Sequence, residues 1–168
     1  MVSMMRNEPG RAEGSVEVEV RAVCEQDQSD WRKLFASYGQ FFDQQMSEKV
    51  LDRFWRWLMD EDHPTSGLVA VKDGQIVGFA HFRPYFRTLT GSSACFLDDL
   101  FVAPAERGRG VGRRLIEATS VLAEKSGWDF VRWMTAQDNR QARQLYDSVA
   151  ERTEWLTYQL SPQTGGKT

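Results

Sequence analysis

Residues 96–114 of this 168-residue chain read FLDDLFVAPAERGRGVGRR. The first seven residues are mostly apolar and predict a strand, and a helix with an apolar face follows directly after the loop. Three glycines within five residues, Gly108, Gly110 and Gly112, let backbone N–H groups converge without obstruction by Cβ atoms. A strand, a glycine-rich loop and a helix N-terminus together predict a site for a phosphorylated group such as pyrophosphate.

Positively charged side chains in the same loop support this prediction, because a guanidinium donates charge-assisted hydrogen bonds to phosphate. They are Arg107, Arg109 and Arg113. Two other phosphate-binding motifs do not fit. A dinucleotide fingerprint requires a glycine where Leu115 stands, and the Gly-Lys-Thr at 166–168 has Ser161 in place of the first P-loop glycine. The loop at 107–112 is therefore the predicted phosphate site.

The rest of the chain predicts a single α/β domain. Alternation predicts a strand over 16–21 and another over 154–160, and Asp73-Gly74 predicts a hairpin between strands 68–71 and 76–82. Further strands are predicted at 94–102 and 130–135, and helices at 31–38, after Ser47 to residue 58, from the loop to Gly127, and at 139–149. This order predicts a mixed sheet flanked by helices.

Composition limits the remaining possibilities. With 41% hydrophobic residues, the chain is long enough for one core, which we place at 15–160 between flexible extensions at 1–14 and 161–168. The net charge of −3 argues against a nucleic-acid partner. The two cysteines lack metal-ligand spacing, so no metal is expected, and the absence of a signal peptide or apolar span predicts a cytoplasmic protein without membrane contact.

Three landmarks resemble the GCN5-related N-acetyltransferase (GNAT) superfamily. Arg107-x-x-Gly110-x-Gly112, following the strand that ends near Pro104, is similar to its acetyl-CoA-binding motif. Asn139, in DNRQARQLY at 138–146, resembles the second cofactor motif, and Tyr146 occupies the place of the usual catalytic tyrosine. The resemblance extends over residues 16–160.

The resemblance implies that acetyl-CoA is the cosubstrate, bound at a splayed central strand. Three strand residues would hold the pantetheine arm through their main chain: Leu100, Phe101 and Val102. The loop and helix start would hold the pyrophosphate: Arg107, Gly108, Arg109, Gly110, Val111, Gly112 and Arg113. Asn139 would contact the cofactor arm, with Arg143 nearby.

Asp98 and Asp99 are adjacent on an otherwise apolar strand, and pleating is expected to send them to opposite faces. The strand is similar to that of polyamine, D-amino-acid and histone acetyltransferases, which implies that an acidic pair serves as base and cation anchor. We assign Asp98 as the base, acting through water, and Asp99 as anchor or second base. The alternative for each is a structural carboxylate that holds a neighbouring backbone group or arginine.

The family's reaction is direct attack of an amine on the acetyl thioester, and Tyr146 is placed by its motif to protonate the leaving thiolate. The alternative for Tyr146 is a core residue on the apolar stripe of its helix. His81 is interpreted as a hydrogen-bonded, partly buried residue rather than a catalytic one.

The predicted function is an N-acetyltransferase acting on a primary amine of a small cationic acceptor, a polyamine or an amino acid. Protein lysine or N-terminal acetylation, aminoglycoside acetylation and a non-catalytic acetyl-CoA-binding module are the alternatives. A homodimer is possible, with the aromatic segment around Trp155 and Tyr158 as the candidate surface.

Overall fold

The computed structural model describes residues 17–162. They form two compact units, one ending at Met134 and one beginning at Thr135. The expected extension at 1–14 and the last six residues of the expected tail lie outside the described part, as does the first residue of the strand predicted at 16–21. Each unit is a body of its own in the description below.

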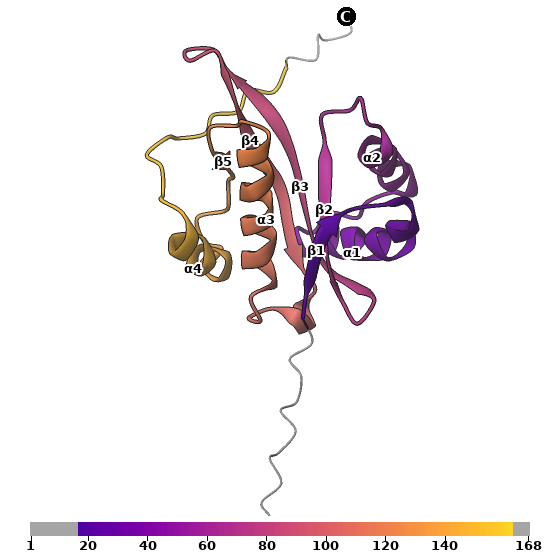
Figure 1. Ribbon diagram of the computed structural model, residues 1–168. Coiled ribbons are helices and arrows are strands. Elements are labelled where there is room, and N and C mark those ends of the chain that lie inside the picture. Colours follow the sequence, from indigo (N-terminus) through magenta and orange to yellow (C-terminus); the bar gives the residue numbers. More distant parts are fainter. Residues whose placement is uncertain (1–16, 163–168) are drawn as a thin grey trace, which may run out of the picture. The chain divides into compact units, whose positions relative to one another are not determined.

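The first unit contains a five-stranded mixed sheet in the order β1-β2-β3-β4-β5 (Figure 1). The strands are β1 (Glu19–Ala22), β2 (Ser66–Lys72), β3 (Gln75–Arg87), β4 (Ser92–Val102) and β5 (Val131–Arg132). The first four pair antiparallel, whereas β5 runs parallel to β4. The predicted hairpin is confirmed: Asp73 and Gly74, with φ of 52° and 74°, form the two-residue turn between β2 and β3.

Helices cover both faces of this sheet (Figure 1). The first unit contains α1 (Gln28–Phe41), α2 (Glu48–Met59) and α3 (Val111–Lys125), with short 3₁₀ turns η1 (Glu25–Asp27) and η2 (Pro104–Glu106). On one face, Trp31, Phe35 and Trp55 of α1 and α2 pack against Phe79 and Phe101 of the sheet. The other face carries α3, where Val111 and Leu115 lie so close to Gly78 that an added Cβ would be only 3.2 Å from each of them.

Local chemistry explains where these helices begin and end. The Ser47 hydroxyl accepts a hydrogen bond from the Val50 N–H and caps α2, as its position before the apolar pattern predicts. Gly110, in the left-handed conformation with φ of 82°, precedes α3, and Gly127 at φ 69° follows its end. Before α1, the Arg21 guanidinium makes two hydrogen bonds to the Asp27 carboxylate. These contacts define the ends of the helices that pack on the sheet containing β4.

The second unit contains one regular element, α4 (Arg140–Val149), within its described residues 135–162. The strand predicted over 154–160 is wrong, because residues 151–162 adopt no helix or strand. Alternating apolar and polar residues indicate a segment with one apolar face. A strand also needs a neighbouring strand that pairs with its backbone N–H and C=O groups. Trp155 and Leu160 are 81% and 94% exposed. The strand predicted at 130–135 is also shorter, since only Val131–Arg132 pair.

No helix within residues 17–162 combines the length and apolar character needed to cross a membrane.

Candidate active site

A β-bulge in β4 determines where the two adjacent aspartates point. Leu97 pairs with Phe82 of β3 and Asp99 pairs with His81, so Asp98 is the extra residue without a partner in the register. Asp99 contacts His81 and Asp98 contacts Arg83. His81 and Arg83 are two apart on β3 and share a face. The prediction that the two carboxylates lie on opposite faces is therefore wrong, because the bulge breaks the alternation between them.

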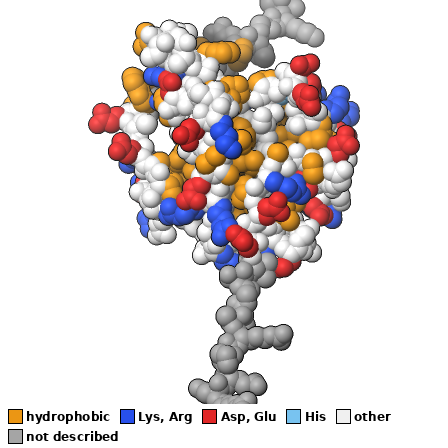
Figure 2. Space-filling model, viewed as in Figure 1, with side chains coloured by type: hydrophobic (Ala, Val, Ile, Leu, Met, Phe, Trp, Pro, Cys, Tyr) orange, Lys and Arg blue, Asp and Glu red, His pale blue; other side chains and the backbone are white. Residues whose placement is uncertain are grey.

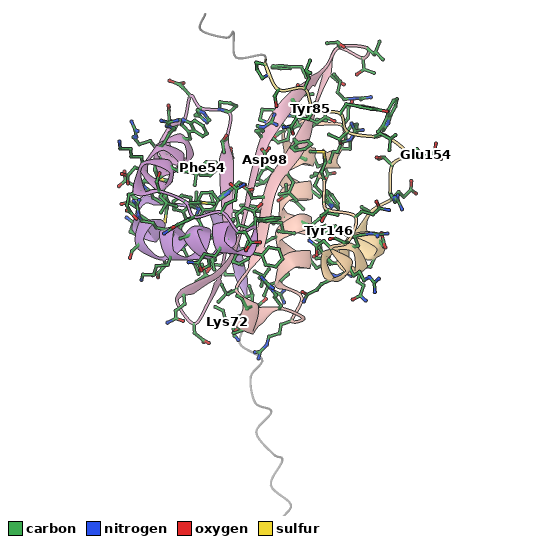
Figure 3. All side chains as sticks on the ribbon, turned by 180° about the vertical axis from the view of Figure 1, so that it is seen from behind. Phe54, Lys72, Tyr85, Asp98, Tyr146 and Glu154 are labelled. Carbon is green, nitrogen blue, oxygen red and sulfur yellow. The ribbon has the colours of Figure 1, made fainter. Side chains whose placement is uncertain are left out.

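Asp98 lies near the middle of the sheet (Figure 3), and its carboxylate is held by one guanidinium. The Arg83 Nε lies 3.1 Å from Asp98 Oδ2, while the guanidinium stacks over the Phe96 ring. Burial nevertheless raises the pKa of Asp98 above its ordinary value, and the nearby Asp99 raises it further, against the opposing charge of Arg83. Asp98 is thus a stronger base than a solvated aspartate when it is ionised.

Asp99 lies at the end of a buried chain of hydrogen bonds. The Trp31 indole N–H donates to His81 Nε2 at 2.9 Å, and His81 Nδ1 lies 3.0 Å from Asp99 Oδ2. The His81 side chain is 1% exposed and that of Asp99 is 19% exposed. His81 is thus hydrogen-bonded, as the sequence suggested, but it is more deeply buried than expected. It is also tied to the predicted site, which the sequence did not show.

The predicted phosphate loop has the backbone geometry that its glycines indicated. Gly108 and Gly110 have φ of 74° and 82°, a region that side-chain-bearing residues rarely adopt. They lead into the first turn of α3, where no side chain caps the helix and no acidic residue stands. The Val111, Gly112 and Arg113 N–H groups in this turn precede the first bond of the helix, from Arg114 N–H to Gly110 O. The arrangement is suited to an anion.

The arginines of the loop differ in what they contact. Arg107 donates from Nε to the Val102 carbonyl at 3.0 Å, and its guanidinium stacks on the rings of Phe41 and Phe101, so this side chain braces the end of β4. Arg109 is 62% exposed and lies 3.7 Å from Glu106. The Arg109 side chain therefore has far more freedom to reach a ligand than that of Arg107.

The edge of β4 that faces away from β3 is open along half its length. β5 pairs with β4 only at Cys95 and Phe96. From Leu97 to Val102, β4 has no partner strand on that side among residues 17–162. The predicted main-chain binding strip at Leu100, Phe101 and Val102 lies in this open stretch, although the Val102 carbonyl already accepts the bond from Arg107.

The other predicted residues belong to the second unit. Asn139 caps α4: its side-chain oxygen accepts from the Ala142 N–H, and its amide nitrogen lies 3.3 Å from the Thr135 hydroxyl. Arg143 donates to the Gln137 carbonyl at 2.8 Å. Tyr146 lies on α4 (Figure 3), and burial raises the pKa of its phenol above the ordinary value. Their position relative to the acidic pair stays a prediction.

Sequence reasoning missed Arg83 and Trp31 as parts of this site. Arg83 is an isolated basic residue in a strand, a weak signal that something acidic lies opposite. Trp31 fits its helix's apolar stripe completely, so nothing in the pattern showed that its N–H has a partner fifty residues away. Only the register of β3 against β4 brings these residues together.

Comparison with known proteins gives consistent matches. The sequence model of the acetyltransferase (GNAT) family matches residues 28–150. The D-amino-acid N-acetyltransferase of Saccharomyces cerevisiae is 29% identical over 156 residues, covering 92% of this chain and 97% of the yeast protein. A ribosomal-protein-alanine N-acetyltransferase from Brucella melitensis has a similar structure, with a TM-score of 0.74 and 26% identity, covering 86% of this chain and 99% of that one.

An aminoglycoside N-acetyltransferase solved in complex with CoA shares the fold, with a TM-score of 0.77 at 20% identity over 90% of this chain and 99% of that one. The mixed α/β fold and these matches define the protein as an acyltransferase. Because the family model spans most of the sequence, the chain belongs to the acetyltransferase (GNAT) family.

Proposed function

We propose that the enzyme transfers the acetyl group of acetyl-CoA to a primary amine of a small cationic acceptor by direct attack. The observation that carries this proposal is the bulge in β4, which brings Asp98 and Asp99 to one face of the strand. The same strand has an open edge and leads into the glycine loop. Cation recognition, proton removal and phosphate binding would thus be supplied by one continuous segment.

The reaction requires two proton transfers. An alkyl ammonium, with a pKa of about 10, must lose a proton before it attacks, and the departing thiolate must gain one. Asp98 takes the first proton through a water molecule. Its raised pKa brings its base strength closer to that of the amine. Asp99 holds the cationic acceptor beside it.

Tyr146 returns a proton to the thiolate in this proposal. Burial raises the pKa of its phenol, so the residue remains protonated across the working range and serves as an acid. Transfer through a cysteine is disfavoured at β4, because burial raises the pKa of Cys95 to about 12 and keeps it a thiol. Direct attack by the amine needs no such nucleophile.

The residues present suit acetyl-CoA. The backbone N–H groups at the start of α3 and the exposed Arg109 would bind the pyrophosphate, and the open edge of β4 would hydrogen-bond the pantetheine amides. The related aminoglycoside enzyme was solved with CoA, which supports this cosubstrate. The Arg107 guanidinium donates to the Val102 carbonyl, so in this proposal it braces the end of β4, whereas the resemblance implies that it binds the pyrophosphate.

The acceptor would be either a polyamine or an amino acid, and the two use different groups. A second ammonium would pair with the Asp99 carboxylate, whereas the carboxylate of an amino acid would pair with the Arg83 guanidinium, which is 43% exposed. The similarity to a D-amino-acid N-acetyltransferase supports the second choice. On the face seen in Figure 2, acidic and basic side chains are mixed, which supports a small-molecule partner rather than nucleic acid.

An acetyl-transfer screen tests the proposal. Release of free CoA thiol is measured with spermidine, D- and L-amino acids, an aminoglycoside and alanine- or lysine-bearing peptides. We expect turnover of a small amine, and no thiol release with any of them would contradict the proposal. The peptides are included because of the structural similarity to a ribosomal-protein-alanine N-acetyltransferase, which favours N-terminal acetylation as the second candidate.

A further inference from the structure

The hydrogen bonds of His81 define its protonation state. An indole N–H is only a donor, so the 2.9 Å bond from Trp31 requires a lone pair on His81 Nε2. The ring proton of the neutral imidazole therefore resides on Nδ1, where it donates to Asp99 Oδ2 at 3.0 Å. An acceptor is needed there, and an ionised carboxylate provides one. The chain thus has a single direction, from Trp31 through His81 to Asp99.

A second proton on His81 is opposed by this arrangement. It would have to enter at Nε2, where it would face the Trp31 N–H and leave two donors opposed in a site that is shielded from water. Trp31 and His81 are 0% and 1% exposed. No water molecule can therefore easily replace the indole as a partner.

The other groups around His81 are mostly uncharged rings, and its charged neighbours act on a ring proton in opposite directions. From α1 and α2 it meets the uncharged rings of Trp31, Phe35 and Phe54, and from its own strand Phe79. Gly67 of β2 also lies against the ring. The charged groups nearby are Asp99 and Asp98 of β4 and Arg83 of β3. The carboxylates favour a protonated ring, and the hydrogen bond from Trp31 is the contact that opposes it.

We propose that Trp31 and His81 are positioning residues that present Asp99 to the acceptor as an oriented and unneutralised anion. A protonated imidazole would pair with Asp99 and cancel the charge that attracts the cationic substrate. A neutral imidazole that donates from Nδ1 fixes the carboxylate and leaves its charge available. His81 contacts Asp99 Oδ2, so in this proposal Oδ1 is the oxygen that binds the acceptor. The inference rests on the proposed function.

Nitrogen-15 NMR of the imidazole tests, without any substrate, whether Trp31 holds His81 in this tautomer. The chain has two histidines, His63 and His81, so a His81→Asn variant assigns the signals. We expect His81 to show the neutral tautomer protonated at Nδ1, because the Trp31 N–H needs the lone pair of Nε2. In Trp31→Phe, Nε2 loses this donor, so the ring should become doubly protonated as the pH is lowered. A wild-type signal from the other tautomer, or from imidazolium near neutral pH, would overturn the inference.

Steady-state kinetics with spermidine and with the fastest acceptor of the screen tests whether this arrangement helps Asp99 to bind the acceptor. In Trp31→Phe, the KM for the acceptor should rise about tenfold between about pH 8 and pH 5.5 relative to wild type, with a smaller change in kcat. Trp55→Phe is the matched control, because Trp55 lies in the same buried cluster and makes no hydrogen bond to His81. Equal pH dependence of KM in the two variants would refute a role for the indole N–H.

His81→Asn and His81→Leu separate positioning from packing. The asparagine amide can donate to Asp99 from nearly the place of Nδ1, so it should keep the acceptor KM within about threefold of wild type, whereas leucine should raise it about tenfold or more. Thermal denaturation shows whether each variant folds. If no acceptor is turned over by wild type, the proposed function fails, while the NMR experiment still decides whether Trp31 sets the state of His81.

Discussion

Replacing Asp98 by asparagine should remove most activity and leave the protein at least as stable. The substitution keeps the shape of the side chain and abolishes its ability to accept a proton. General base catalysis contributes about 10²- to 10⁴-fold, and because this base acts through water, we expect a loss of about 10²-fold in kcat/KM. Affinity for acetyl-CoA should remain unchanged, since Asp98 lies outside the glycine loop.

The stability prediction follows from the direction of the pKa shift. The pKa of Asp98 is raised in the folded protein, so the folded state binds this proton more tightly than the unfolded state does. Its contribution to stability is present at low pH and is lost as the pH rises from the unfolded value of about 3.9 through the raised folded value. At neutral pH the ionised carboxylate is therefore unfavourable for folding, and the neutral amide should not lower the melting temperature.

The assay is a pH profile of kcat/KM for the best acceptor. In wild type, activity should fall on the acid side as Asp98 becomes protonated, at a pH above the ordinary range of aspartate. Arg83→Gln provides the comparison, because removing the guanidinium 3.1 Å away should move this acid limb to higher pH. An Asp98→Asn enzyme that retains both the rate and the acid limb would refute the assignment of Asp98 as base.

Three further predictions concern other parts of the chain. Gly110→Asp should abolish acetyl-CoA binding in calorimetry, because it places a strained residue and a negative charge at the start of α3, whereas Gly74→Ala, with a similar positive φ, should bind normally. Tyr146→Phe should lower kcat in steady-state assays without changing acetyl-CoA affinity, and a wild-type rate would exclude it as the acid. Asp27→Asn should lower the free energy of unfolding at pH 7 by about 2 kcal/mol in urea titrations. The pKa of Asp27 is lowered to about 2 by Arg21, so this difference should fade as the pH drops from about 4 towards 2.

Much of the fold could be predicted because its signals are local. The hairpin at Asp73-Gly74, the cap at Ser47 and the glycine loop before α3 each depend on the conformational preferences of a few consecutive residues. The aromatic stripe of α1 follows from helical periodicity alone. In each case, the residues that determine the structure lie next to one another in the chain.

Predictions failed where the structure depends on a partner strand. The alternation over 154–160 resembles a strand, yet residues 151–162 form no strand, and Trp155 and Leu160 remain exposed. The bulge at Asp98 is likewise a property of two strands, since it exists only as an offset between β4 and β3. A single-strand pattern has no means of showing that offset.

The bulge also explains how two identical neighbours in the sequence can perform different tasks. Without it, one carboxylate would enter the α3 face and the pair would be separated by the sheet. With it, the two share a face but meet different partners on β3: Asp98 a charged guanidinium and Asp99 a neutral imidazole. Mutual repulsion disfavours simultaneous ionisation, and it contributes to the raised pKa of Asp98. The raised pKa of Asp98 suits it to take up a proton, while Asp99 accepts the hydrogen bond from His81.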